Sequence, residues 1–261
     1  KYPKPEKLIW RPDRQITEYD IDGVQIIETK FISMNDVVCS IIKSSKPIKI
    51  RFNGTGFHNP MELPTFDGDD AGIPWQQNLE STISFNPKDN AINIYESSDM
   101  MVKPDWGKNA VRGRMMYDGM SVCISSTKSI NNSYNGSYDE NKVPIFDFTI
   151  DCDSSGTAIF YSIGDNYSEV ISNIKSVRSN VEKALSSKTN HMNQLLNYQI
   201  PYFRCSDQSV VETYYYLWAI YFMYFIDVDE GYMEYPHTQT AINNFMGLHL
   251  WDSSVYARMG S

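Results

Sequence analysis

The chain has 261 residues, of which 41% are apolar and 21% are charged, a composition typical of a folded globular protein. Its length allows one large domain or two smaller ones. Lysine and arginine number 23 against 32 aspartate and glutamate residues, which gives a net charge of −9. We expect no nucleic-acid partner, because such an acidic chain lacks a basic face, and no membrane span, because no apolar run is long enough.

Aromatic residues make up 13% of the chain, with 18 Tyr, 12 Phe and 5 Trp. Tyrosine and tryptophan combine an apolar ring with a hydrogen-bonding edge, which suits sugar-binding or peptide-binding surfaces. A tyrosine-rich β core would produce the same composition. Composition alone leaves both interpretations open.

Short runs with alternating or β-branched apolar residues recur through residues 1–165, which predicts a mainly antiparallel β-sandwich as the first domain. Turn residues at Pro87–Asn90 and Asp118–Gly119 predict hairpins between neighbouring strands. The expected strands are Val24–Ile32, Asp36–Lys43, Pro47–Phe52, Thr82–Phe85, Ala91–Tyr95, Arg112–Tyr117, Met120–Ser125, Ile145–Asp151 and Thr157–Ile163.

Two stretches interrupt this pattern, Asn53–Gln77 and Ser126–Asn141. The first is rich in Gly, Pro and Asp, and the second in Ser, Asn and Tyr. We expect both to be long loops, the second one exposed.

The four cysteines, Cys39, Cys123, Cys152 and Cys205, form no CxxC pair and no zinc-ligand pattern with histidine. Three of them lie in strand-like runs, where we expect them to pack as small apolar residues. A disulfide between Cys123 and Cys152 stays open.

The spacing of apolar residues changes in residues 166–200, where they recur at offsets of three and four. This stripe predicts a linker helix, with the apolar residues Val170, Ile171, Ile174, Val177, Val181, Ala184 and Leu185. A second helix is expected after a cap at Ser206 or Asp207, and its residues Val210–Ile226 are almost all apolar or aromatic. Such a helix must be covered on all sides, so we expect covering helices after Ser261. The chain would then be the front part of a larger protein or one half of a nicked one.

Near the end of the chain, Trp251 and Asp252 precede a helix-like run that begins at Ser253. A carboxylate at a helix start can accept hydrogen bonds from two neighbouring sugar hydroxyls, and an indole face can stack on a pyranose ring. His249 and Arg258 add hydrogen-bond donors nearby. This group is the leading candidate for a substrate-binding site, although a core tryptophan next to a plain helix cap would have the same sequence.

The segment Trp251-Asp252-Ser253, which follows an aromatic helix and a loop, resembles the Trp-Asp-Ser segment of trehalases and of related processing glucosidases and mannosidases. The motif-level resemblance covers only Trp251–Gly260, and the glycine-rich, arginine-containing stretch that precedes Trp-Asp in trehalases is missing. The resemblance implies the six-hairpin (α/α)6 barrel, preceded by a β-sandwich and a linker helix. Residues 201–261 would then form the first helices of that barrel.

By this resemblance, Trp251 and Asp252 would bind the sugar where the bond breaks. The family's general acid and base are carboxylates on later helices, so we expect them outside this chain. The resemblance implies a glycoside hydrolase acting on an oligosaccharide or polysaccharide, by an inverting two-carboxylate mechanism. The expected location is secreted, periplasmic or at the cell surface.

Residues Asp227–His237 hold four carboxylates and one histidine. Hard cations prefer several oxygen ligands, so Ca²⁺ is conceivable here, but the spacing is not that of an EF-hand and a solvated acidic loop is the default. No cofactor is expected otherwise. In a six-hairpin barrel such a loop would border the active-site mouth, which makes Glu234 and His237 further candidate substrate contacts.

Two other functions compete with the enzyme. A non-catalytic sandwich would recognise glycan or protein through Trp75, Trp106, Tyr134 and Tyr138. A structural module would instead need a partner chain to cover the helix at 210–226.

Overall fold

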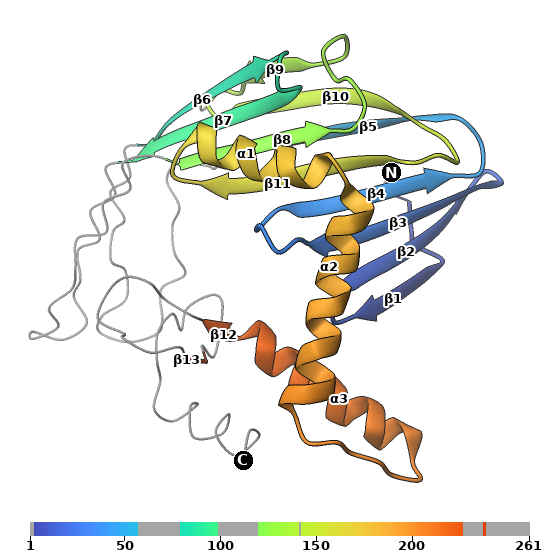
Figure 1. Ribbon diagram of the computed structural model, residues 1–261. Helices are drawn as coiled ribbons and strands as arrows, with labels where there is room; N and C mark the ends of the chain where they lie inside the picture. Colours follow the sequence, from blue (N-terminus) through green and yellow to red (C-terminus); the bar gives the residue numbers. More distant parts are fainter. Residues whose placement is uncertain (1–2, 57–78, 99–119, 141, 227–236, 239–261) are drawn as a thin grey trace, which may run out of the picture. The chain divides into compact units, whose positions relative to one another are not determined.

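The computed structural model describes residues 3–56, 79–98, 120–140, 142–226 and 237–238 (Figure 1). The chain divides into two compact units, Lys1–Lys188 and Thr189–Ser261. The boundaries expected at residues 165 and 200 stay predictions.

The first unit contains two antiparallel sheets, which confirms the predicted β-sandwich (Figure 1). The larger sheet has the strand order β1-β2-β3-β4-β11-β8-β7-β6, and the smaller one has the order β5-β10-β9. The strands are β1 Lys7–Arg11, β2 Arg14–Ile21, β3 Val24–Ile32, β4 Val38–Ser44, β5 Ile48–Thr55, β6 Leu79–Asn86, β7 Ala91–Ser98, β8 Met120–Ser126, β9 Asn135–Tyr138, β10 Pro144–Cys152 and β11 Thr157–Gly164.

Side chains alternate between two apolar layers along the central strands of the larger sheet. On β11, Ile159 points into a cluster shared with Phe146 and Phe148 of β10, between the two sheets. Its neighbours Ala158 and Phe160 belong to a second cluster, on the opposite face. Because successive residues of a strand face opposite sides, β11 is buried on both faces and forms the centre of a three-layer structure.

Helix α1 (Tyr167–Arg178) forms the third layer and lies on β11 and β8 (Figure 1). Asn166 caps its start by accepting a hydrogen bond from the backbone N–H of Glu169 at 3.0 Å. The apolar stripe predicted for this segment is buried against the larger sheet, at Val170, Ile171, Ile174 and Val177.

The predicted single stripe is divided between two helices, since α2 (Val181–Gln194) begins after a break at Ser179 and Asn180. Val181, Ala184 and Leu185 continue the contact with the same cluster. The stripe therefore spans a bend that the spacing of apolar residues did not reveal.

Two parts of the sandwich differ from the sequence prediction. The hairpin of β1 and β2 was not predicted, because the side chains of β1 are mostly exposed and show no buried alternation. The segment Ser126–Asn141, expected as an exposed loop, contains strand β9 and the fully buried Ile130. The predicted strand Arg112–Tyr117 and the loop core 57–77 lie outside the described residues.

The three strand cysteines, Cys39, Cys123 and Cys152, are buried free thiols, in line with their expected role as packing residues. Cys123 Sγ donates to Asn93 Oδ1 at 3.5 Å, and Cys152 Sγ donates to the carbonyl of Ile42 at 3.3 Å. The disulfide that the sequence left open is therefore not formed.

In the second unit, a short π-helical turn (Leu195–Gln199) precedes helix α3 (Gln208–Met223). Asp207 caps α3, as predicted, by accepting a hydrogen bond from the backbone N–H of Ser209 at 2.9 Å. The two-residue strands β12 (Phe225–Ile226) and β13 (His237–Thr238) pair antiparallel.

Candidate functional site

Most of the substrate-binding residues predicted from the sequence lie outside the described residues. These are Trp251, Asp252, Arg258, His249 and Glu234. His237 is described, in β13, where its backbone pairs with that of Ile226. The geometry of this candidate site therefore stays a prediction.

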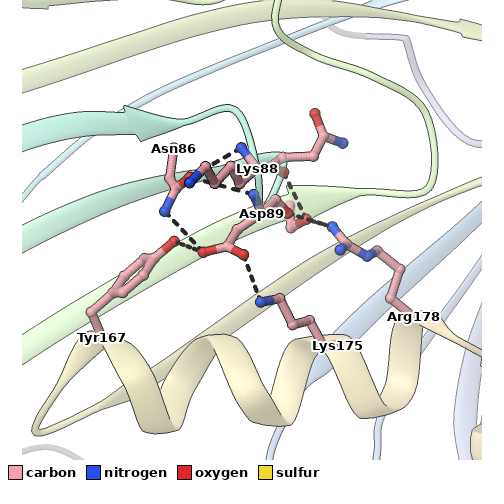
Figure 2. A network of polar contacts seen from close by, with 8 residues as sticks. Asn86, Lys88, Asp89, Tyr167, Lys175 and Arg178 are labelled. Carbon is pink, nitrogen blue, oxygen red and sulfur yellow. Dashed lines mark hydrogen bonds and ion pairs between the residues drawn. The ribbon is translucent and has the colours of Figure 1, made fainter.

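A polar cluster around Asp89 lies where the β6–β7 turn meets α1 (Figure 2). The Asp89 carboxylate accepts hydrogen bonds from the Tyr167 hydroxyl at 2.6 Å and from Asn86 Nδ2 at 2.9 Å. Lys175 Nζ lies 2.6 Å from its other oxygen. Asp89 thus joins both ends of α1 to a single turn of the sheet.

Arg178, at the C-terminal end of α1, is held by one contact to the same turn and one to strand β8 (Figure 2). One of its terminal nitrogens, Nη1, donates to the carbonyl of Asp89 and to Ser125 Oγ, each at 2.7 Å. A cation in the last turn of a helix also interacts favourably with the helix dipole.

Asn90 connects the same turn to the segment that follows β8. Its backbone adopts a left-handed conformation, with φ of 51°, which asparagine tolerates better than most residues. Its side-chain amide donates to the carbonyls of Ser126 and Lys128 at 3.0 and 2.8 Å, and its oxygen accepts from the backbone N–H of Ile130 at 2.9 Å. The Asn90 side chain therefore connects the β6–β7 turn to the segment after β8, which are not joined by strand pairing.

A pocket of about 510 Å³ opens between these three parts of the first unit. Its lining is polar apart from one proline, and it consists of Pro87, Asn90, Ser126, Thr127, Ser129 and Arg178. Arg178 is the only charged residue among them. The pocket suits a small hydrophilic molecule rather than an apolar one.

Two titratable groups of the Asp89 cluster are displaced from their ordinary behaviour. The hydrogen bonds from Lys175 and Tyr167 lower the pKa of Asp89, because they stabilise its ionised form. Burial and the hydrogen bond to Asp89 raise the pKa of Tyr167. At neutral pH the Asp89 carboxylate is therefore ionised, and it accepts a hydrogen bond from the neutral phenol of Tyr167.

A second, smaller pocket of about 170 Å³ lies on α3 and is lined by Tyr214, Leu217, Trp218 and Tyr221. Tyr214 is fixed by its hydroxyl, which donates to the carbonyl of Pro201 at 2.7 Å, and by stacking on Phe203. Aromatic rings of this kind can receive either a pyranose face or an apolar protein surface.

The two tyrosines proposed for a binding sandwich contribute to the packing of the small sheet. Tyr134 stacks on Phe85, with ring centroids 5.1 Å apart, and contacts the core between the sheets. Tyr138 is half exposed, and its hydroxyl accepts a hydrogen bond from the backbone N–H of Ile83 at 3.1 Å. Trp75 and Trp106 lie outside the described residues.

Within the part of the chain that the structure describes, no three His, Cys, Asp or Glu side chains come together as metal ligands. The acidic segment 227–236 lies outside that part. None of the described helices combines the length and the apolar character needed to span a bilayer.

The sequence did not identify the Asp89 cluster or its pocket. The hairpin signal at Pro87–Asn90 located the turn, but the partners of Asp89 lie 78 and 86 positions further along the chain, at Tyr167 and Lys175. A usable signal was the pair of cations at the end of the apolar stripe, since Lys175 and Arg178 lie beside its buried residues.

The chain matches no protein-family model and none of the curated proteins. Among solved structures it is similar to one described as "Putative kojibiose phosphorylase from human microbiome", with a TM-score of 0.32 and 8% sequence identity. The similarity covers 81% of this chain, which spans 23% of the length of that protein.

Proposed function

We propose that this chain is the N-terminal part of a carbohydrate-active enzyme that hydrolyses glycosidic bonds of oligosaccharides or polysaccharides. The order of elements along the chain is the observation that carries the proposal. An antiparallel sandwich is followed by α1 and α2 and then by the aromatic helix α3, which Asp207 caps. The Trp251-Asp252-Ser253 segment comes next in the sequence, as in the families that it resembles.

In this proposal, Trp251 and Asp252 hold the reacting sugar. The indole face of Trp251 packs against a pyranose ring, and the carboxylate of Asp252 accepts hydrogen bonds from two neighbouring hydroxyls. Hydrogen bonds to sugar hydroxyls that strengthen in the transition state lower the barrier to bond cleavage. Arg258, His249, Glu234 and His237 are secondary contacts at the same mouth.

The reaction is proposed to invert the anomeric centre. It needs two carboxyl groups, one that protonates the leaving oxygen and one that activates water. In the resembling families these groups belong to helices later in the sequence, so the proposal assigns neither role to residues 1–261. No metal or other cofactor takes part in this scheme.

The test is the Asp252→Ala variant of the complete enzyme, assayed on its best substrate from a panel of aryl glycosides and oligosaccharides. We expect kcat/KM to fall about 100-fold or more, because contacts that tighten in the transition state are lost. Asp151→Ala is the matched control, since it removes an exposed carboxylate of the sandwich that has no role in the proposal. Unchanged kcat/KM for Asp252→Ala would remove this residue from the site.

The same panel separates the enzyme from a non-catalytic binding sandwich. Trp251→Ala should reduce turnover, whereas Trp75→Ala and Trp106→Ala should leave it unchanged. Sugar binding without turnover, abolished by Trp75→Ala or Trp106→Ala, would instead establish the binding protein. The described residues do not favour that rival, because Tyr134 and Tyr138 are engaged in packing and hydrogen bonding.

A further inference from the structure

We propose that the pocket beside Arg178 binds a small molecule through a carboxylate or phosphate group. The proposal uses residues other than Trp251 and Asp252 and does not rest on glycosidase activity. Three features of the pocket support it: the free edge of the guanidinium, the local charge, and the hydroxyl groups around the opening.

The guanidinium of Arg178 is fixed with one edge available. Both protons of Nη1 are used, in the hydrogen bonds to the carbonyl of Asp89 and to Ser125 Oγ. Among the described residues, none accepts a hydrogen bond from Nε or Nη2. These two nitrogens present parallel N–H groups, the arrangement that pairs with two oxygens of a carboxylate or phosphate. Because the partners of Nη1 hold the side chain in place, little rotamer entropy is lost on binding.

The charge around the pocket favours an anion, although the chain as a whole carries −9. The Asp89 carboxylate of the adjoining cluster pairs with Lys175, whose Nζ lies 2.6 Å away, and it also interacts electrostatically with Arg178. None of the residues that line the pocket carries a negative charge.

The remaining groups define the size and polarity of the ligand. Ser129 is exposed at the opening, where its hydroxyl can face a polar ligand, whereas the Thr127 hydroxyl is engaged with Thr157 and with the backbone of Ala158. A volume of about 510 Å³ admits a molecule of the size of a sugar acid or a sugar phosphate. Both candidate ligands are small hydrophilic molecules that carry one oxyanion group.

The test is calorimetric titration of the 261-residue chain at low salt with three probes: glucuronate, inorganic phosphate and glucose. Glucuronate and glucose differ chiefly in the carboxylate, so their comparison isolates the charge. We expect at least one of the two anions to bind, with Kd on the order of 1 mM, and glucose to bind at least about tenfold more weakly. Binding of glucuronate alone would indicate a carboxylate ligand, and binding of phosphate alone a phosphate ligand.

Two variants of one residue locate the binding in the pocket without disturbing α1. Ser129→Asp introduces a negative charge at the opening and should weaken anion binding about tenfold or more, whereas Ser129→Asn should have little effect. Arg178→Gln should abolish binding, with Arg204→Gln as a control for the loss of one positive charge elsewhere. If neither anion binds, if glucose binds as well as glucuronate, or if Ser129→Asp leaves affinity unchanged, the proposal is wrong.

Discussion

Replacing Asp89 with asparagine should destabilise the first unit by about 2 kcal/mol, because the carboxylate charge strengthens two contacts to α1. The Tyr167 hydroxyl donates a hydrogen bond of 2.6 Å to the charged carboxylate. In the asparagine variant the amide oxygen can still accept this bond, but the acceptor is no longer charged. That change costs about 1 kcal/mol, the difference between a charged and a neutral hydrogen bond. Lys175 is about half exposed, at 48%, so losing its ion pair adds no more than about 1 kcal/mol.

The assay is thermal and urea unfolding, followed by near-ultraviolet circular dichroism of the whole chain. A loss of about 2 kcal/mol in a unit of this size corresponds to a decrease in Tm of about 4–8 °C. Asp151→Asn is the matched control, because Asp151 is an exposed aspartate on strand β10 of the smaller sheet. The reasoning is refuted if Asp89→Asn lowers Tm no more than Asp151→Asn does.

The pH dependence gives a second test of the same contact. The pKa of Asp89 is lower in the folded protein than in the unfolded chain, so its contribution is fully present above the unfolded pKa of about 4. That contribution disappears as the pH falls through the lower, folded pKa. The stability difference between the wild-type protein and Asp89→Asn should therefore be constant near neutral pH and shrink below about pH 4.

In the folded protein at neutral pH, only the exposed thiol of Cys205 should react with a thiol reagent, whereas all four thiols should react in urea. Burial protects Cys39, Cys123 and Cys152 in the folded protein, and it raises the pKa of Cys39 to about 12. Ile130→Ala should cost about 2–5 kcal/mol in urea unfolding, since Ile130 is fully buried, whereas an exposed loop residue would cost almost nothing. Asp207→Ala should reduce the stability of α3 by about 1 kcal/mol, seen as lower helical circular dichroism at elevated temperature, and Asp207→Asn should retain most of it.

The strands of the sandwich were predictable where burial alternates along the chain. On β5, Ile50 and Phe52 pack against the inter-sheet core, whereas Lys49 and Arg51 between them are exposed, and the hairpin at Pro87–Asn90 carries a local turn signal. Strand β1 gives no such signal, because it is an edge strand that is open to solvent on both faces. Periodicity identifies a strand only where one face is covered.

The segment around Ile130 was misjudged because its composition is that of a loop. Its order comes instead from long-range contacts, above all the three hydrogen bonds that Asn90 makes to it across about 40 positions of sequence. A lone apolar residue within a polar stretch, as Ile130 is, was the available hint. The composition of a segment indicates its local conformational preference. It cannot indicate that a side chain distant in sequence, here Asn90, will hold the segment by hydrogen bonds.

The position of Arg178 follows from two different kinds of contact along α1. Small residues on the sheet beneath the helix, Ala91, Cys123 and Ala158, let α1 approach closely. Gly164 contributes as well, since a Cβ there would lie 2.9 Å from a methyl group of Val170. Apolar packing of this kind sets the distance between α1 and the sheet. It constrains the position of α1 along its own axis only weakly, because the hydrophobic effect is not directional.

The Asp89 cluster fixes the position of α1 along its axis. Hydrogen bonds have preferred geometries, so contacts from Tyr167 near the start of α1 and from Lys175 near its end fix the helix along its axis. Arg178 then reaches the carbonyl of Asp89 and Ser125 Oγ without further adjustment. An enlarged residue at Ala158, beneath α1, should therefore weaken anion binding in the pocket and the stability of the first unit together, as measured by calorimetric titration and urea unfolding.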